Sequence, residues 1–140
     1  MKKLIILRGI PGSGKSTYAN KLKEFYIKEN KTIAHWEADM FFTKPDGSYD
    51  WKPNLVGVAH KWCQDKVRNS LDNCDVVIVS NTSLTESEVN TYVQIGKTAG
   101  AEILIYRVTG NYQNVHGVPE ETLEKMKAKL QDYPGEHFVN

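Results

Sequence analysis

The sequence predicts an α/β fold in three layers, with a small parallel sheet flanked by helices. Short apolar runs that contain β-branched residues alternate with amphipathic segments along the whole chain. The runs are continuously apolar, which is typical of strands that are buried on both faces. Strands that alternate with helices form a parallel sheet covered on both sides. The 140 residues contain no linker, repeat or low-complexity stretch, so we expect one domain over 1–140.

Apolar spacing and local signals place the elements in chain order. We expect strands over residues 4–7, 32–36, 76–79 and 103–108, and helices over residues 13–30, 54–73, 85–98 and 119–131. Thr85 and Glu88 have the spacing of a capping box at a helix start, and Pro119 suits a first helical position. Asp46 and Gly47 mark a turn within a loop over 43–53.

The composition argues against several classes of protein. Because 18 basic residues face 17 acidic ones, no global field attracts the chain to nucleic acid or to a membrane surface. Cys63 and Cys74 form no Cys-x-x-Cys pair, which argues against a disulfide framework or a zinc site, and free thiols fit a reducing cytosol. The apolar run at 4–7 is too short for a signal peptide or a membrane span. We therefore expect a cytoplasmic protein with no membrane partner.

A glycine-rich segment carries the strongest chemical signal. Residues 9–16 read Gly-Ile-Pro-Gly-Ser-Gly-Lys-Ser and fit the pattern G-x-x-x-x-G-K-[ST], between an expected strand and an expected helix. Glycines let the backbone approach oxygen atoms closely, and successive N–H groups at the start of a helix bind phosphates. Lys15 would contact the β- and γ-phosphates, and the Ser16 hydroxyl would ligate Mg²⁺.

This pattern predicts a P-loop NTPase fold that binds a nucleoside triphosphate, ATP with Mg²⁺. The alternative is a chance match in a turn that contains glycines. The expected nucleotide-binding residues are Gly9, Pro11, Gly12, Ser13, Gly14, Lys15, Ser16 and Thr17.

Polar side chains after two other strands are candidates for the acceptor side of a phosphoryl transfer. Asp39 follows the second expected strand, so it would lie at the sheet edge of the phosphate loop and accept a hydroxyl proton. A surface carboxylate or a helix cap is the alternative for this residue. Asn81 and Thr82 follow the third strand, where residues 80–83 include no carboxylate. The metal would then rest on Ser16, phosphate oxygens and water, with Asn81 or Asp39 in an outer shell.

Aromatic residues near this edge offer a surface for stacking. Tyr49 and Trp51 lie in the expected loop and are candidates for contact with a substrate ring. Trp36 and Trp62 occupy strand and helix positions with apolar neighbours, so packing in the core is expected for them.

Seven pieces of the chain resemble a group of P-loop kinases. The group contains the kinase domain of phage polynucleotide 5′-kinase and the kinase-like module of animal ubiquitin-ligase-binding proteins, and it is often labelled as AAA-type ATPase. The pieces lie at 8–17, 38–42, 46–49, 59–62, 80–84, 88–92 and 114–119. The Asp-Gly-x-Tyr, Ala-His-x-Trp and His-Gly-Val-Pro pieces are similar to the animal-type module. The resemblance implies that Asp39 is the general base on a 5′-hydroxyl.

The chain departs from this family in three places. Met40 stands where the family often has a second Asp, and Asn81 lies in a strand-three motif that usually carries a carboxylate. The family usually has a lid with arginines before the Val-Pro pair, whereas residues 110–116 contain none. Arg107 is the nearest guanidinium, and it joins His116 as a further candidate on the substrate side. Lid arginines stabilise charge on the transferring phosphoryl, so a slow kinase, a kinase completed by a protein partner, or a nucleotide-binding relic is implied.

Two functions remain open on this reasoning. The first is a kinase that transfers the γ-phosphoryl of ATP to a hydroxyl acceptor, either a nucleic-acid 5′-hydroxyl or a nucleoside or sugar. The second is a nucleotide-binding switch or adaptor without phosphoryl transfer. An ATP hydrolase is a third and weaker alternative, because no residue stands out for positioning water.

Overall fold

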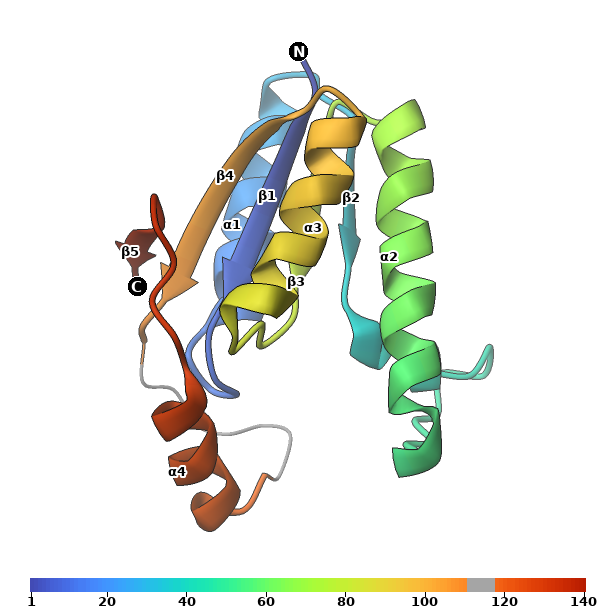
Figure 1. Ribbon diagram of the computed structural model, residues 1–140. Helices are drawn as coiled ribbons and strands as arrows, with labels where there is room; N and C mark the ends of the chain where they lie inside the picture. Colours follow the sequence, from blue (N-terminus) through green and yellow to red (C-terminus); the bar gives the residue numbers. More distant parts are fainter. Residues whose placement is uncertain (111–117) are drawn as a thin grey trace.

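The computed structural model describes residues 1–110 and 118–140, which form a five-stranded parallel sheet between two layers of helices (Figure 1). The strands are β1 (Lys3–Arg8), β2 (Ile33–Trp36), β3 (Val76–Ser80), β4 (Glu102–Val108) and β5 (His137–Val139). The helices are α1 (Lys15–Lys28), α2 (Val56–Asn73), α3 (Glu86–Thr98) and α4 (Glu120–Lys129), with 3₁₀ turns η1 (Ala38–Phe42) and η2 (Pro53–Leu55). The strand order is β2-β3-β1-β4-β5, and every neighbouring pair is parallel.

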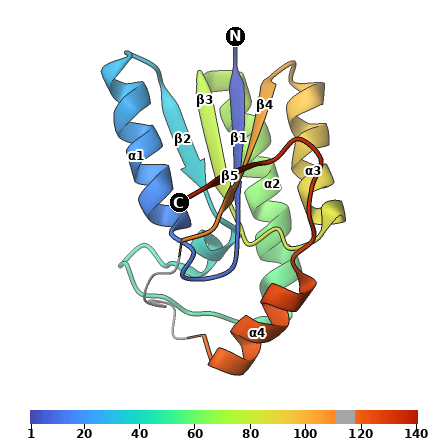
Figure 2. The same ribbon diagram turned by 90° about the vertical axis from the view of Figure 1, so that its left-hand side faces the viewer.

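The central strand β1 packs against helices on both sides. Helix α1 covers one face of the sheet, and α2 and α3 cover the other (Figure 2). Because successive side chains of a strand point to opposite faces, Ile5 and Leu7 join the core under α1, while Leu4 and Ile6 join the larger core under α2 and α3. All four side chains are fully buried. The continuous apolar run at residues 4–7 therefore corresponds to a strand that is buried on both faces of the sheet, and the three-layer α/β prediction is confirmed.

The carboxyl ends of the parallel strands meet at one edge of the sheet. The loop after β1, the turn η1 after β2 and the helix α4 all lie toward this edge (Figure 1). Open parallel sheets bind ligands at this edge. Within the described parts of the chain, no helix combines the length and the apolar character needed to cross a bilayer.

Two elements were not expected from the sequence. Strand β5 is only three residues long, and it exists because β4 pairs with it and the Thr109 N–H donates to the Val139 carbonyl at 2.8 Å. The turn η1 follows β2 after one intervening residue, where the sequence predicted no regular element. The first helix begins at Lys15 and not at residue 13, because Gly14 takes a left-handed conformation (φ 98°) as its N-cap.

Candidate functional site

The segment between β1 and α1 forms a compact loop held to the neighbouring strands. The Gly9 N–H donates to the Thr82 carbonyl at 3.1 Å, which ties the start of the loop to the chain that follows β3. A side chain at Gly9 has no room, because a Cβ there would lie 2.7 Å from the Val108 carbonyl oxygen and 2.6 Å from Ser13 Oγ. The backbone therefore passes between its neighbours at a distance that only glycine allows.

Lys15 lies over this loop. Its Nζ donates to the Gly9 carbonyl at 2.7 Å and to the Ile10 carbonyl at 3.0 Å, so the ammonium is held at the centre of the loop. Burial lowers the pKa of Lys15 to about 8, and the negative charge of Glu37 opposes that shift. A partly buried ammonium held by carbonyls is well placed to bind an anion, which would replace lost hydration with an opposite charge.

One buried polar atom in the loop also fits an anionic ligand. Ser13 Oγ is the single buried side-chain oxygen or nitrogen among the described residues that has no hydrogen-bond partner. Buried hydroxyls are normally paired, so an unpaired one inside a loop of N–H groups suits a ligand with several acceptor oxygens. A phosphate group provides them.

The residues available for a metal ion are few. Ser16 and Thr17 are exposed in the first turn of α1, beside the loop. No group of three or more His, Cys, Asp or Glu side chains within the described residues could hold a metal ion. Magnesium at this position would take Ser16 as a protein ligand and phosphate oxygens and water as the others, which suits an ion that keeps much of its hydration.

Asp39 lies in η1, and an aromatic hydroxyl covers it. The Tyr49 hydroxyl donates to Asp39 Oδ1 at 2.5 Å. Tyr49 reaches it because the loop folds back, with Thr43 bridging to Tyr49 and the Asp50 N–H donating to the Phe42 carbonyl at 2.9 Å. Partial desolvation of its hydroxyl, together with the bond to Asp39, raises the pKa of Tyr49 to about 12, so the hydroxyl remains a neutral donor although the residue is more than half exposed. The carboxylate is thus oriented at the same sheet edge as Lys15.

Asn81 connects the end of β3 to the turn that carries Asp39. Its Oδ1 accepts the Ala38 N–H at 2.8 Å, and its Nδ2 donates to the Tyr92 hydroxyl at 3.3 Å. Asn81 is buried, so its side chain holds η1 in place from within the protein. Thr82 contributes through its backbone carbonyl, which accepts the Gly9 N–H. Both residues lie between the phosphate loop and Asp39.

Glu37 is a carboxylate at this edge that our sequence reasoning missed. It directly follows β2, and the Ser80 hydroxyl at the end of β3 donates to its Oε1 at 2.8 Å. Its charge acts on Lys15, where it raises the pKa against the effect of burial. The signal was present in the sequence, because Glu37 precedes Asp39 by two residues and follows the same expected strand.

A family model described as an AAA domain matches residues 4–111, which include the phosphate loop, Glu37, Asp39 and Asn81. The chain belongs to this family of P-loop kinase-like proteins. A protein of Pasteurella multocida, uncharacterized protein PM0531, is 33% identical over 99% of this chain and 82% of its own length. Human NEDD4-binding protein 2 is 28% identical over 93% of this chain, which corresponds to 8% of the human protein. The resemblance to the animal ubiquitin-ligase-binding module is therefore confirmed.

Solved structures confirm the P-loop NTPase fold of this AAA-domain member. Kti12 of Chaetomium thermophilum in complex with ADP-AlF3 has a TM-score of 0.72 at 14% identity, over 97% of this chain and 88% of that one. The APS kinase CysC of Mycobacterium tuberculosis, in complex with AMPPNP and APS, has a TM-score of 0.66 at 14% identity over 99% and 89%. A chain of the Pnkp1/Rnl/Hen1 RNA repair complex has a TM-score of 0.68 at 24% identity over 93% and 44%.

The remaining substrate-side candidates have different surroundings. Tyr49 and Trp51 are both more than half exposed, as a stacking surface requires. Trp36 and Trp62 instead pack edge to face, with ring centroids 5.6 Å apart, and lie against the larger core. His116 lies outside the described residues.

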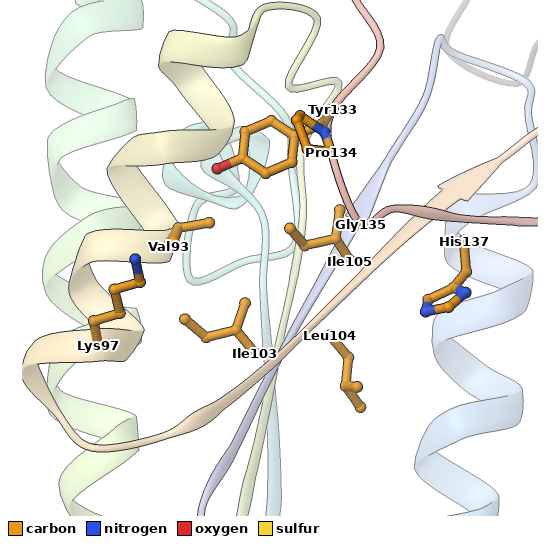
Figure 3. Close-up of a pocket in the computed structure, with 9 residues that line it drawn as sticks. All are labelled: Val93, Lys97, Ile103, Leu104, Ile105, Tyr133, Pro134, Gly135 and His137. Atoms are coloured by element: carbon orange, nitrogen blue, oxygen red, sulfur yellow. The ribbon is translucent and has the colours of Figure 1, made fainter.

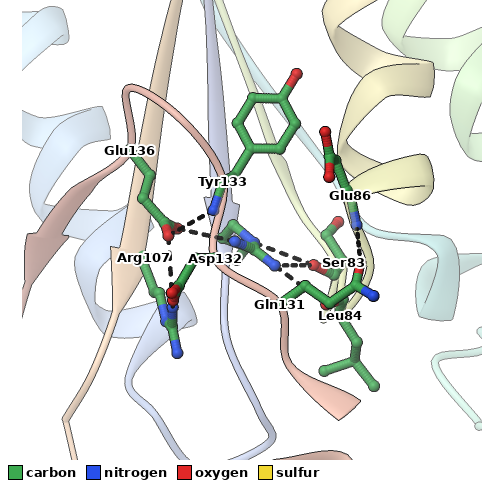
Figure 4. Close-up of polar contacts among 9 residues, drawn as sticks. Ser83, Leu84, Glu86, Arg107, Gln131, Asp132, Tyr133 and Glu136 are labelled. Atoms are coloured by element: carbon green, nitrogen blue, oxygen red, sulfur yellow. Dashed lines mark hydrogen bonds and ion pairs between the residues drawn. The ribbon is translucent and has the colours of Figure 1, made fainter.

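Arg107 is engaged by the C-terminal segment 131–140. Its Nη1 donates to Asp132 Oδ1 at 2.5 Å and lies 3.4 Å from Glu136 Oε2 (Figure 4). Its guanidinium also lies over the Phe138 ring. Glu136 also pairs with Arg8, the residue before the phosphate loop, at 2.8 Å. Arg107, the guanidinium nearest in sequence to residues 110–116, is therefore part of the contact between β4 and the chain end.

One hollow lies away from the phosphate loop. It has a volume of about 250 Å³ and lies between α3, the middle of β4 and the C-terminal segment (Figure 3). Its lining is mostly apolar and includes Val93, Ile103, Ile105 and Tyr133. None of the candidate residues of the phosphate loop or of η1 lines it.

Proposed function

We propose that this protein is an ATP-dependent kinase that transfers the γ-phosphoryl of Mg²⁺-bound ATP to a hydroxyl acceptor. The observation that carries the proposal is the carboxylate of Asp39, oriented by the Tyr49 hydroxyl at the same sheet edge as Lys15. The loop that presents Lys15 suits a triphosphate, and the Asp39 carboxylate suits the proton of an attacking hydroxyl. Kinase structures with the same fold, such as the APS kinase complexed with AMPPNP and APS, support this reading.

Each residue has a defined role in the proposed reaction. The loop N–H groups and Lys15 hold the β- and γ-phosphates, and Ser16 would ligate the magnesium ion, which neutralises phosphate charge. Asp39 accepts the proton of the acceptor hydroxyl while the acceptor oxygen bonds to the γ-phosphorus. The bond from that phosphorus to the β–γ bridging oxygen breaks, so the products are ADP and the phosphorylated acceptor. Tyr49 occupies one carboxylate oxygen of Asp39 and leaves the other for the acceptor.

Two classes of acceptor fit this arrangement. The chain in the RNA repair complex supports a nucleic-acid 5′-hydroxyl, and exposed Tyr49 and Trp51 would provide rings on which a base can stack. The net charge of +1 supports a smaller acceptor, a nucleoside or a sugar, because a polynucleotide is usually held by a basic surface. Asn81 and Thr82 would contribute by holding η1 and the phosphate loop in register.

A second candidate is a nucleotide-binding switch or adaptor without transfer. Arg107, which could otherwise offset charge on the transferring phosphoryl, is bound by Asp132 and Glu136. The kinase would then need an arginine from a protein partner, whereas a switch would need none.

Product analysis with γ-labelled ATP separates the two functions. We expect label transfer to at least one member of a panel of 5′-hydroxyl oligonucleotides, nucleosides and sugars, and at least a 100-fold lower rate in Asp39→Asn, since a general base supplies about that factor or more. Asp72→Asn is the matched control, because Asp72 is an exposed carboxylate on α2. ATP binding without acceptor-dependent turnover for any acceptor would support the switch and refute the kinase.

A further inference from the structure

Three polar side chains form a hydrogen-bonded chain where β2 and β3 end. His35 Nε2 lies 2.5 Å from Ser80 Oγ, and Ser80 Oγ lies 2.8 Å from Glu37 Oε1. Ser80 is buried, and the His35 side chain is only 9% exposed, whereas the Glu37 side chain is 22% exposed. The chain therefore runs from the interior toward a carboxylate that solvent and ligands can reach.

The direction of these hydrogen bonds follows from the number of hydrogens available. Burial lowers the pKa of His35 to about 4, so the ring is neutral near pH 7 and one of its nitrogens is protonated. The single hydroxyl hydrogen of Ser80 is donated to Glu37, so Ser80 can only accept from His35, and the proton must be on Nε2. Both bonds thus point toward Glu37 and orient its Oε1.

The sheet register places Glu37 at the same end of the sheet as the phosphate loop, with β3 between them. Trp36 pairs with Val79, so Glu37 is level with Ser80, and Ser80 in turn pairs with Leu7, two residues before Gly9. Within the described parts of the chain, the other oxygen of Glu37, Oε2, makes no hydrogen bond. A carboxylate oxygen with free acceptor positions therefore lies at the same sheet edge as the phosphate loop and Asp39.

We propose that Glu37 is the carboxylate of the metal–triphosphate site, that it accepts hydrogen bonds from water bound to magnesium, and that Ser80 and His35 are its positioning residues. This inference rests on the nucleotide binding proposed above, but not on phosphoryl transfer. Residues 80–83 have no carboxylate of their own, and Ser80 brings the carboxylate of the neighbouring strand to that position. Contact through water fits Mg²⁺, which dehydrates reluctantly.

The proposal predicts that the charge of Glu37 weakens ATP binding without magnesium and strengthens it with magnesium. Next to a triphosphate that carries no metal, the negative charge of Glu37 is repulsive. When magnesium is bound, the same carboxylate stabilises the hydrated ion. Removing the charge should therefore tighten the binding of free ATP and weaken the binding of Mg²⁺ to the ATP complex. A purely structural role would instead weaken the binding of both forms.

Titration calorimetry of ATP, in magnesium and in EDTA, tests this with Glu37→Gln. We expect the variant to bind ATP more tightly in EDTA than the native protein does. Its magnesium dependence should shift to about 10-fold higher Mg²⁺ concentration, the usual loss for an outer-shell partner. Ser80→Ala, which leaves the carboxylate but removes its orienting donor, should show a smaller shift of the same sign. Glu102→Gln at the opposite sheet edge is the control, and it should change neither the ATP affinity in EDTA nor the magnesium dependence.

Equal loss of affinity in magnesium and in EDTA would overturn the inference, as would an unchanged magnesium dependence in Glu37→Gln. If the native protein bound no ATP in either condition, the proposed nucleotide site itself would be refuted. If ATP bound with the expected magnesium shift but no acceptor were phosphorylated, the kinase proposal alone would fail, and the role of Glu37 would stand.

Discussion

Replacing Glu136 by glutamine removes one charge from an ion pair that is almost completely buried. Arg8 is fully buried, and its Nη1 lies 2.8 Å from Glu136 Oε1, while the Glu136 side chain is 3% exposed. Arg8 also donates to the Ser83 and Leu84 carbonyls, so its guanidinium is held in place whether or not Glu136 is charged. The variant therefore leaves a buried cation without its counterion.

The expected cost follows from this burial. Removing one partner of a buried ion pair lowers the free energy of unfolding by about 3–5 kcal/mol, a large part of the roughly 5–15 kcal/mol that stabilises a typical domain. For a domain of this size, that loss lowers Tm by about 10–20 °C. Thermal unfolding followed by circular dichroism measures the shift, and urea unfolding gives the free energy independently.

Asp132→Asn is the matched control, because it makes the same chemical change in the same group of charges. Asp132 pairs with Arg107, but its side chain is 90% exposed, so the expected loss is below about 1 kcal/mol. Two results would refute the reasoning: a Tm change in Glu136→Gln no larger than that of Asp132→Asn, or a loss of stability below about 1 kcal/mol in urea.

Two further predictions concern the phosphate loop. Lys15→Ala should keep its fold but bind ATP about 10- to 100-fold more weakly by calorimetry, since charged hydrogen bonds contribute about 1.5–3 kcal/mol each. Lys28→Ala at the far end of α1 is the control, and unchanged ATP affinity in Lys15→Ala would contradict the assignment. Gly9→Ala should lower the free energy of unfolding in urea by about 1–3 kcal/mol, because its Cβ would lie 2.7 Å from the Val108 carbonyl oxygen. Gly57→Ala, which has open space around it, should not be destabilised, and equal stability of the two variants would refute the steric argument.

The parts of the fold that could be predicted depend on strong local signals. β1 and β3 are continuous apolar runs, and the Thr85 side chain accepts the Glu88 N–H as the capping-box spacing predicts. β5 has no such signal, because its three residues are held by pairing with β4 and not by a hydrophobic pattern. A short edge strand is thus visible only when its partner strand is in place.

The same distinction applies to the candidate site. The phosphate loop is contiguous in the sequence, so one pattern names its residues. The contact between Tyr49 and Asp39 depends on a loop that folds back over η1, and Arg107 meets Asp132 and Glu136 only because the C-terminal segment returns to β4. The sequence marked Arg107 as the nearest guanidinium but gave no indication of these partners.

The strand order explains why Glu37 could be overlooked. A search for a metal-site carboxylate along the chain looks at the end of β3, the strand beside β1, and residues 80–83 contain none. In the sheet, β2 is the next neighbour of β3, and the register sets Glu37 level with Ser80. The Ser80 hydroxyl therefore serves as the link that places a carboxylate from one strand at the end of another. Loss of an acidic residue from one position does not imply loss of its charge from the site, when a neighbouring parallel strand ends at the same edge.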